Sequence, residues 1–202
     1  MSVLYKTVAK TAEATQIIEK SRFIAHIKSV SSKEDADAFV MEMKKAYKDA
    51  THNVPAYVIG DKMQIQWASD DGEPQGTSGA PIVQMLVGEG LTNVCVVVTR
   101  YFGGIKLGTG GLVRAYTSSA KMAIEAAGIL EVRDFEEVEL KIPYSQLAML
   151  QNIEKSMPFS IESIEYLESL KIKLKFESEY REEVEDFLVD FTKGKFQKSI
   201  EK

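Results

Sequence analysis

The sequence is poor in the residues that build disulfides and metal sites. Among 202 residues there is one cysteine, Cys95, and there are two histidines, His26 and His52. A single thiol cannot form an internal disulfide and brings no second sulfur ligand to a zinc site, which excludes a disulfide scaffold and disfavours a structural zinc module. We therefore expect no metal and no cofactor, and a soluble protein of the reducing cytoplasm.

Long apolar runs and an excess of positive charge are also missing. No stretch of about 18 apolar residues exists, so no membrane span is expected. Residues 1–134 carry 15 basic and 15 acidic groups, and the remaining residues carry 10 and 15, so the net charge of −5 lies in the C-terminal third. This balance argues against charge-driven nucleic-acid binding by the whole molecule.

Glycine divides the chain into two regions. Twelve of the 13 glycines precede residue 130, and the other is Gly194. We predict an N-terminal domain over residues 1–132 with glycine-rich loops and a C-terminal domain over 133–202.

The N-terminal pattern predicts an α/β layer domain with mixed strands. Ser32 and Asp35 resemble a capping box that begins a helix. The β-branched run 94–99 predicts a central strand, and a helix over 112–127 should end at Gly128. The other expected elements are strands over 3–9, 14–19 and 22–30, a hairpin of 54–60 with 63–68, and a short helix over 80–87.

The C-terminal pattern predicts the order βαββαβ, which is ferredoxin-like. We expect strands over 138–142, 159–166, 171–176 and 195–200, a helix from Pro143, and a helix capped by Ser178 that ends at Gly194. The fold class is therefore α+β. The outward positions of this sheet are charged and lack stacking aromatics, which disfavours base-specific RNA readout there. These positions are Glu137, Glu139, Lys141, Lys171, Lys173 and Lys175, and we expect them to pair across the sheet.

The loop from Arg100 to Arg114 is the main candidate site. It leaves a buried strand, contains five glycines and enters a helix with Thr109 as a plausible cap. Exposed amides at a helix N-terminus bind anions, and a tight structural crossover is an equally good interpretation. The spacing matches neither the P-loop nor the dinucleotide fingerprint. The anion- or RNA-binding candidates are Arg100, Gly103, Gly104, Lys106, Thr109, Gly110, Gly111 and Arg114.

A second, acidic loop spans residues 69–79. A metal or general-acid role is conceivable for its carboxylates, but turn hydrogen bonds and salt bridges to Arg100 or Arg114 explain them better. The secondary candidates are His52, Asp70, Asp71, Glu73 and Thr77. His52 and His26 are more readily structural than catalytic, and Cys95 is expected to be a buried, inert thiol. No catalytic residue is assigned.

Three motifs together resemble the IMPACT/YigZ family. They are Thr51 to Tyr57, Asp70 to Gly79, and the long and highly specific stretch Val97 to Tyr116; the resemblance covers nearly the whole chain. It implies an N-terminal domain like the second domain of ribosomal protein S5 and a ferredoxin-like C-terminal domain. Position 54 is valine where many members have cysteine, so the resemblance implies no thiol chemistry there.

The resemblance also implies a link to translation, because eukaryotic members restrain an initiation-factor kinase pathway through an additional domain. The leading hypothesis is therefore a non-enzymatic translation-associated factor that binds RNA, the ribosome or a translation partner through its N-terminal domain. One alternative is an enzyme acting on a phosphorylated small molecule. The other is an interaction module that uses the acidic C-terminal domain.

Overall fold

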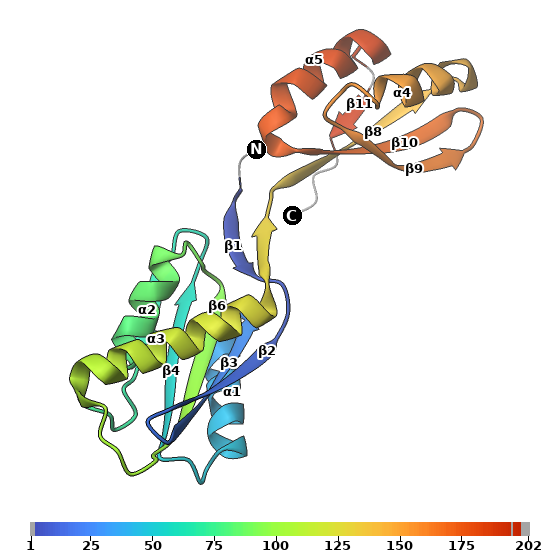
Figure 1. Ribbon diagram of the computed structural model, residues 1–202. Coiled ribbons are helices and arrows are strands. Elements are labelled where there is room, and N and C mark those ends of the chain that lie inside the picture. Colours follow the sequence, from blue (N-terminus) through green and yellow to red (C-terminus); the bar gives the residue numbers. More distant parts are fainter. Residues whose placement is uncertain (1–2, 195, 199–202) are drawn as a thin grey trace. The chain divides into compact units, whose positions relative to one another are not determined.

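The computed structural model describes residues 3–194 and 196–198. Contacts divide the chain into one compact unit over Leu4–Val132 and a second that begins at Arg133. Both units combine helices and strands, and the α+β class of the chain is as predicted (Figure 1).

The N-terminal unit is built on an antiparallel sheet in the order β2-β3-β6-β4-β5 among the described strands. Every neighbouring pair is antiparallel, so the expectation of mixed strands was wrong. The β-branched run lies in β6, at the centre, as predicted. The elements of the sheet are β2 (Ala12–Ile18), β3 (Ser21–Ser29), β4 (His52–Ile59), β5 (Ile65–Ala68) and β6 (Val94–Tyr101).

Helices cover both faces of this sheet because the strands are apolar on both sides. The helix α1 (Lys33–Ala46) packs on the face that carries Tyr57 and Val97. The helices α2 (Gly79–Gly88) and α3 (Gly108–Ala127) cover the opposite face, which carries Val96 and Val98. The predicted Ser32 cap is confirmed, since its hydroxyl accepts the Asp35 amide at 3.1 Å.

A two-stranded ribbon was only half predicted. β1 (Tyr5–Val8) pairs antiparallel with β7 (Ile129–Val132) instead of joining the main sheet. The sequence after Gly128 gave no clear strand signal, and the pairing depends on residues more than 120 positions apart.

The C-terminal unit has the predicted ferredoxin-like order. Its described strands lie in the order β11-β8-β10-β9, and its helices pack on the apolar face of the sheet. The elements are β8 (Phe135–Ile142), η1 (Tyr144–Gln146), α4 (Leu147–Ile153), β9 (Ser160–Tyr166), β10 (Leu170–Glu177), η2 (Ser178–Tyr180), α5 (Arg181–Thr192) and β11 (Phe196–Lys198).

One predicted cap in this unit was wrong. The Ser178 hydroxyl donates to Asp134 at 2.9 Å, and a short 3₁₀ turn precedes α5. The last turn of α5 ends with Lys193 in the left-handed region before Gly194. Parts of the expected strand 195–200 lie outside the described residues.

Candidate functional site

Arg100 does not reach solvent, although it was a candidate for anion binding. It alternates with Val96 and Val98 along β6 and therefore points to the face covered by α3. Its side chain is only 5% exposed, and its Nη1 donates to Glu73 Oε1 at 2.7 Å. Its Nη2 donates to the Ser21 hydroxyl at 3.3 Å. The guanidinium is thus neutralised internally, and it holds the 69–79 loop against the sheet.

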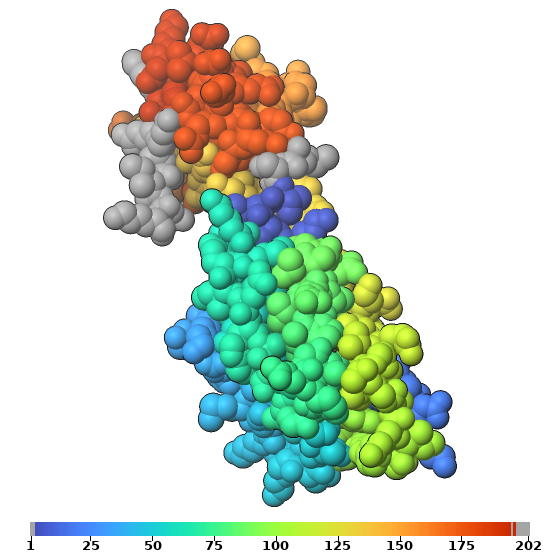
Figure 2. Space-filling view, turned by 90° about the vertical axis from the view of Figure 1, so that its left-hand side faces the viewer, coloured from blue at the N-terminus to red at the C-terminus, as the bar shows by residue number. Residues whose placement is uncertain are grey.

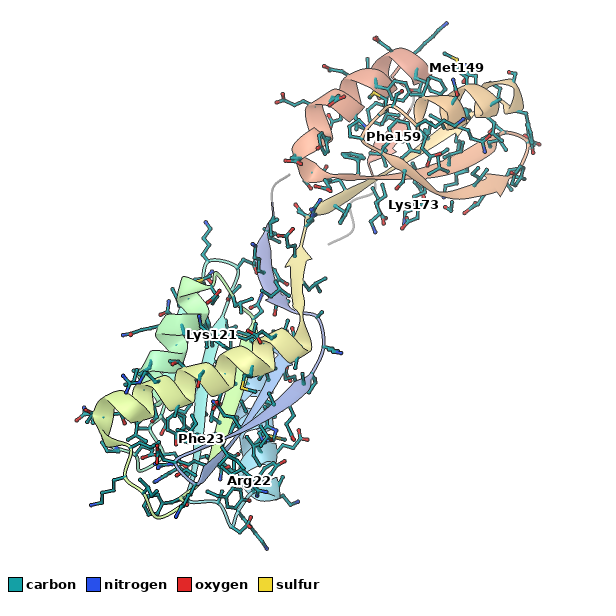
Figure 3. The ribbon with its side chains drawn as sticks, viewed as in Figure 1. Arg22, Phe23, Lys121, Met149, Phe159 and Lys173 are labelled. Carbon is teal, nitrogen blue, oxygen red and sulfur yellow. The ribbon has the colours of Figure 1, made fainter. Side chains whose placement is uncertain are left out.

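Glu73 is the centre of this buried network. The Tyr116 hydroxyl, on α3, donates to the same Oε1 at 2.7 Å, and His52 Nε2 lies 3.8 Å from Oε2. Burial, followed by the hydrogen bond to Glu73, raises the pKa of Tyr116 well above its usual range. Phe23 packs edge-on against Tyr116 with ring centroids 5.3 Å apart, between the sheet and α3 (Figure 3). The predicted salt bridge between the acidic loop and Arg100 is confirmed.

The Asp70 carboxylate holds the N-terminus of α2. Its Oδ1 accepts the backbone amides of Ser78 and Gly79 and the Ser78 hydroxyl, and its Oδ2 accepts the amide of Gly76 at 2.7 Å. Burial opposes the charge, but these hydrogen bonds prevail and lower the pKa of Asp70. Both carboxylate oxygens of Asp70 therefore accept backbone amides at or just before the start of α2.

Asp71 and Thr77 are also used within the loop. Asp71 accepts the backbone amide of Asn53 and pairs with Lys44, each at 2.6 Å. The Thr77 hydroxyl donates to the Pro74 carbonyl at 2.6 Å. Among the described residues, no group of three His, Cys, Asp or Glu side chains is placed to hold a metal ion. The geometry gives the acidic loop a structural role.

At four of the candidate positions the structure explains why the residue is glycine. A Cβ on Gly103 would lie 2.1 Å from the carbonyl carbon and oxygen of Lys20, so only glycine fits against that turn. Gly104 and Gly108 have φ of +87° and +68°, which other residues rarely adopt. A Cβ on Gly111 would approach the Leu107 Cβ to 3.0 Å.

Gly110 differs from these four. Its φ is not positive, and a Cβ built on it meets nothing within 4 Å. It nevertheless lies in the first turn of α3, where glycine costs about 1 kcal/mol relative to alanine. The fold itself gives no reason for glycine at this position.

The start of α3 is exposed and flanked by cations. The helix begins at Gly108, with Leu107 at the cap position, so the expectation that Thr109 caps it was wrong; Thr109 lies inside the first turn. Lys106 and Arg114 line a groove of about 560 Å³ beside this end, together with Ile105 and, from the β2–β3 turn, Glu19. Neither cation has an ion-pair partner in the described part of the chain.

Sequence reasoning missed Ser21 and the polar role of Tyr116. Ser21 Oγ accepts both Arg100 Nη2 and the amide of Gly103, at 3.3 and 3.1 Å. Tyr116 falls within the helix predicted over 112–127, and the helical pattern gave no sign that its hydroxyl would donate to Glu73. The signal that could have revealed this network is the period-2 alternation from Val94 to Arg100. It places the Arg100 charge on the buried face of the strand, and a buried charge requires a partner.

Cys95 and His26 are buried on the α1 face. Cys95 is fully buried, as expected, and burial raises the pKa of its thiol to about 12, which disfavours a thiolate nucleophile at neutral pH. His26 Nδ1 lies 3.2 Å from Glu13 Oε2, and its ring lies 4.7 Å from that of Tyr47. His26 Nε2 is buried without a hydrogen-bond partner.

Protonation of His26 should destabilise the N-terminal unit. Burial lowers the pKa of His26 from its ordinary value of 6.5, and Glu13 offsets this only in part. As the pH falls, the unfolded chain therefore binds the proton before the folded chain does. The contribution of neutral His26 to the free energy of unfolding is complete above pH 6.5 and is lost as the pH falls below it. We expect urea unfolding to show a stability loss as the pH falls below 6.5 that is smaller in His26→Gln. An equal loss in both proteins would contradict this assignment.

The open face of the C-terminal sheet carries the predicted cross-strand pairs. Lys171 lies 2.9 Å from Glu139, and Lys173 pairs with Glu137 and points away from α4 and α5 (Figure 3). These ion pairs neutralise most of the charged side chains on the open face of the sheet. The expectation of no aromatic on this face was wrong, because Phe135 is 48% exposed at its edge, with Lys175 Nζ 5.1 Å from the ring centroid.

Comparisons with known proteins agree with this architecture. The family model "Impact N-terminal domain" matches residues 19–124, and a domain of unknown function, DUF1949, matches residues 140–195. In the part of the chain that the structure describes, no helix has the length and apolarity needed to cross a bilayer.

Two curated bacterial proteins align along most of this chain. The IMPACT family member YvyE of Bacillus subtilis is 39% identical over 95% of this chain and 88% of its own length. The IMPACT family member YigZ of Escherichia coli is 34% identical over 89% of each. A crystal structure of a hypothetical protein aligns with a TM-score of 0.62 at 32% identity, covering 98% of both chains. With both domain models matched in order and such identity along nearly its whole length, the chain belongs to the IMPACT family.

Proposed function

We propose that this protein is a non-enzymatic, cytoplasmic, translation-associated regulatory factor that binds RNA phosphates at the amino end of α3. The link to translation comes from membership of the IMPACT family. The binding site is proposed from one observation: two cations without partners, Lys106 and Arg114, flank an exposed helix start that contains Gly110.

The chemistry of this surface suits a phosphate. The first backbone amides of a helix lack intrahelical acceptors, and the helix dipole adds partial positive charge at this end. Arg114 would be mildly unfavourable there without an anion to compensate it. The missing side chain at Gly110 leaves space for a phosphate to approach the main chain closely. Arg100 is not part of this surface, because Glu73 already neutralises it.

The structure gives less support to the alternatives. Glu73, Asp70 and Asp71 are each engaged by hydrogen bonds or ion pairs within the unit, so none is left to hold a metal beside a phosphorylated substrate. Lysines neutralise much of the acidic row on the C-terminal sheet, which weakens the case for an acidic docking face there.

The test is binding of single-stranded RNA and of ribosomes by a Lys106→Gln/Arg114→Gln variant. Loss of two charge-assisted contacts should weaken binding by about 1–3 kcal/mol, or roughly 5–150-fold. The slope of log K against log salt should become shallower by about 1.4, which corresponds to two phosphates. Filter binding and ribosome co-sedimentation over a range of salt concentrations measure both quantities.

The matched control is Lys33→Gln/Lys121→Gln, which removes two exposed lysines from α1 and α3. It should retain the affinity and nearly the wild-type salt slope. Equal losses in the two double variants would refute the site. Ribosome binding that survives nuclease treatment of the RNA would favour a protein partner and contradict the phosphate assignment.

A further inference from the structure

The edge strand β5 has an unpaired side. It pairs with β4 alone, and no described strand lies beyond it in the sheet. Figure 2 faces this part of the molecule, where the turquoise residues around β5 lie beside the green residues of α2. Three successive residues, Ile65, Gln66 and Trp67, are exposed. An edge of this kind offers backbone hydrogen-bonding groups to another chain.

The pairing register identifies the free groups. The Ser69 amide donates to the Pro55 carbonyl at 3.1 Å, so Ser69 occupies a hydrogen-bonded position opposite β4. Hydrogen-bonded and non-bonded pairs alternate in an antiparallel ladder. Trp67 and Ile65 therefore bond to β4, whereas the N–H and C=O groups of Gln66 and Ala68 point to the open edge.

Apart from its shortness, four residues, this edge lacks the usual protection against pairing. Natural edge strands carry charges, prolines or bulges, and β2, at the opposite edge of the sheet, has Glu13 within it. The segment from Met63 to Ser69 contains no charge and no proline. Beside it lies an open groove of about 390 Å³, lined by Gln66 and Ala68 of β5 and by Val83 and Gln84 of α2.

The exposed apolar side chains of β5 are complementary to themselves. Trp67 is 42% exposed and stacks on Tyr57 at 5.1 Å, and Ile65 is 43% exposed on the same face. An antiparallel pairing of two β5 strands centred on Gln66 places Trp67 of each copy opposite Ile65 of the other. Such aromatic–aliphatic pairs stabilise sheets.

The charges that flank the strand favour the same arrangement. Lys62 precedes β5 and has no ion-pair partner among the described residues, whereas Asp70 and Asp71 follow it. Antiparallel self-pairing centred on Gln66 brings Lys62 toward Asp70 of the second copy, whose carboxylate keeps its hydrogen bonds at the start of α2 and contributes longer-range attraction. A parallel arrangement would place like charges together.

We propose that β5 is a self-association surface, on which β5 of a second copy pairs antiparallel in the register Trp67 to Ile65. The two sheets then continue across the two-fold axis, with the Gln66 backbones of the two copies exchanging hydrogen bonds. Four residues make a short interface, so the association is weak and concentration-dependent.

Trp67 is the only tryptophan in the chain, so under folding conditions the tryptophan fluorescence comes from this edge. We expect sedimentation equilibrium between about 10 μM and 1 mM, a range suited to weak Kd values, to show dimers. A blue shift of the emission should follow the same concentration dependence. Gln66→Pro removes the outward N–H of both copies and should lower the association constant by about 5–150-fold. Gln66→Thr keeps the amide and should associate as the wild type does.

Charge variants test the register independently of proline. Gln66 lies opposite Gln66 of the second copy at the centre of the pairing. Gln66→Lys and Gln66→Glu each place like charges opposite one another and should weaken association by about two- to fivefold. An equimolar mixture of the two should restore it. The proposal is overturned if the wild type stays monomeric over the whole range, if Gln66→Pro associates normally, or if the mixture gains nothing. A blue shift on adding a foreign extended peptide, without self-association, would also overturn it.

Discussion

Arg100→Ala should lower the free energy of unfolding of the N-terminal unit by about 3–5 kcal/mol, because it leaves a buried carboxylate without its partner. Glu73 lies in the interior with Tyr116 as its other close donor. The substitution also removes the bond from Arg100 on β6 to the Ser21 hydroxyl on β3. Urea unfolding followed by Trp67 fluorescence measures the loss in the unit that carries the network.

The control for this prediction is Arg114→Ala. Arg114 is exposed and has no ion-pair partner in the described residues, so the change should alter stability by less than about 0.5 kcal/mol. A double variant, Arg100→Met/Glu73→Gln, should recover a large part of the loss, since no uncompensated charge remains. If Arg100→Ala is as stable as the wild type, the ion pair does not hold the loop. The buried assignment would then be wrong, and Arg100 would return as an anion-binding candidate.

Gly103→Ala should be the second most damaging change. Its Cβ would lie 2.1 Å from the carbonyl group of Lys20 and 2.5 Å from the Ser21 nitrogen. These are backbone atoms of the β2–β3 turn, in which Glu19 and Lys20 both have positive φ, so the neighbours cannot rotate away. We expect a loss at or above the 1–3 kcal/mol typical of overpacking, measured by the same urea titration.

Gly110→Ala should have the opposite sign in the same assay. Its Cβ meets open space in the first turn of α3, so alanine should stabilise the unit by about 0.5–1 kcal/mol. If the amino end of α3 binds phosphate, this more stable variant should nevertheless bind RNA less well than the wild type. A stabilised variant with unchanged RNA affinity would show that Gly110 has no role in binding.

The sequence determined the local elements of both units. The alternation of β10, the helical spacing on α5 and the order of elements predicted the ferredoxin-like unit, because its strands bury one face and expose the other. In the N-terminal unit, the buried run of β6 and the turn at Gly60 predicted a central strand and a hairpin. These signals are short-range, so they can be read without knowing what lies across the core.

Only the tertiary structure decided which charges are available for binding. Arg100 and Arg114 stand 14 residues apart in one glycine-rich stretch, yet one pairs with Glu73 beneath α3 and the other lines an open groove. It also decided why each glycine is there, since Gly103 is required by a turn more than 80 residues earlier whereas Gly110 meets nothing. The physical reason is that ion pairs and close approach depend on atoms brought together from distant parts of the chain. The alternation along β6 indicates that Arg100 faces the core, but no local pattern identifies its partner.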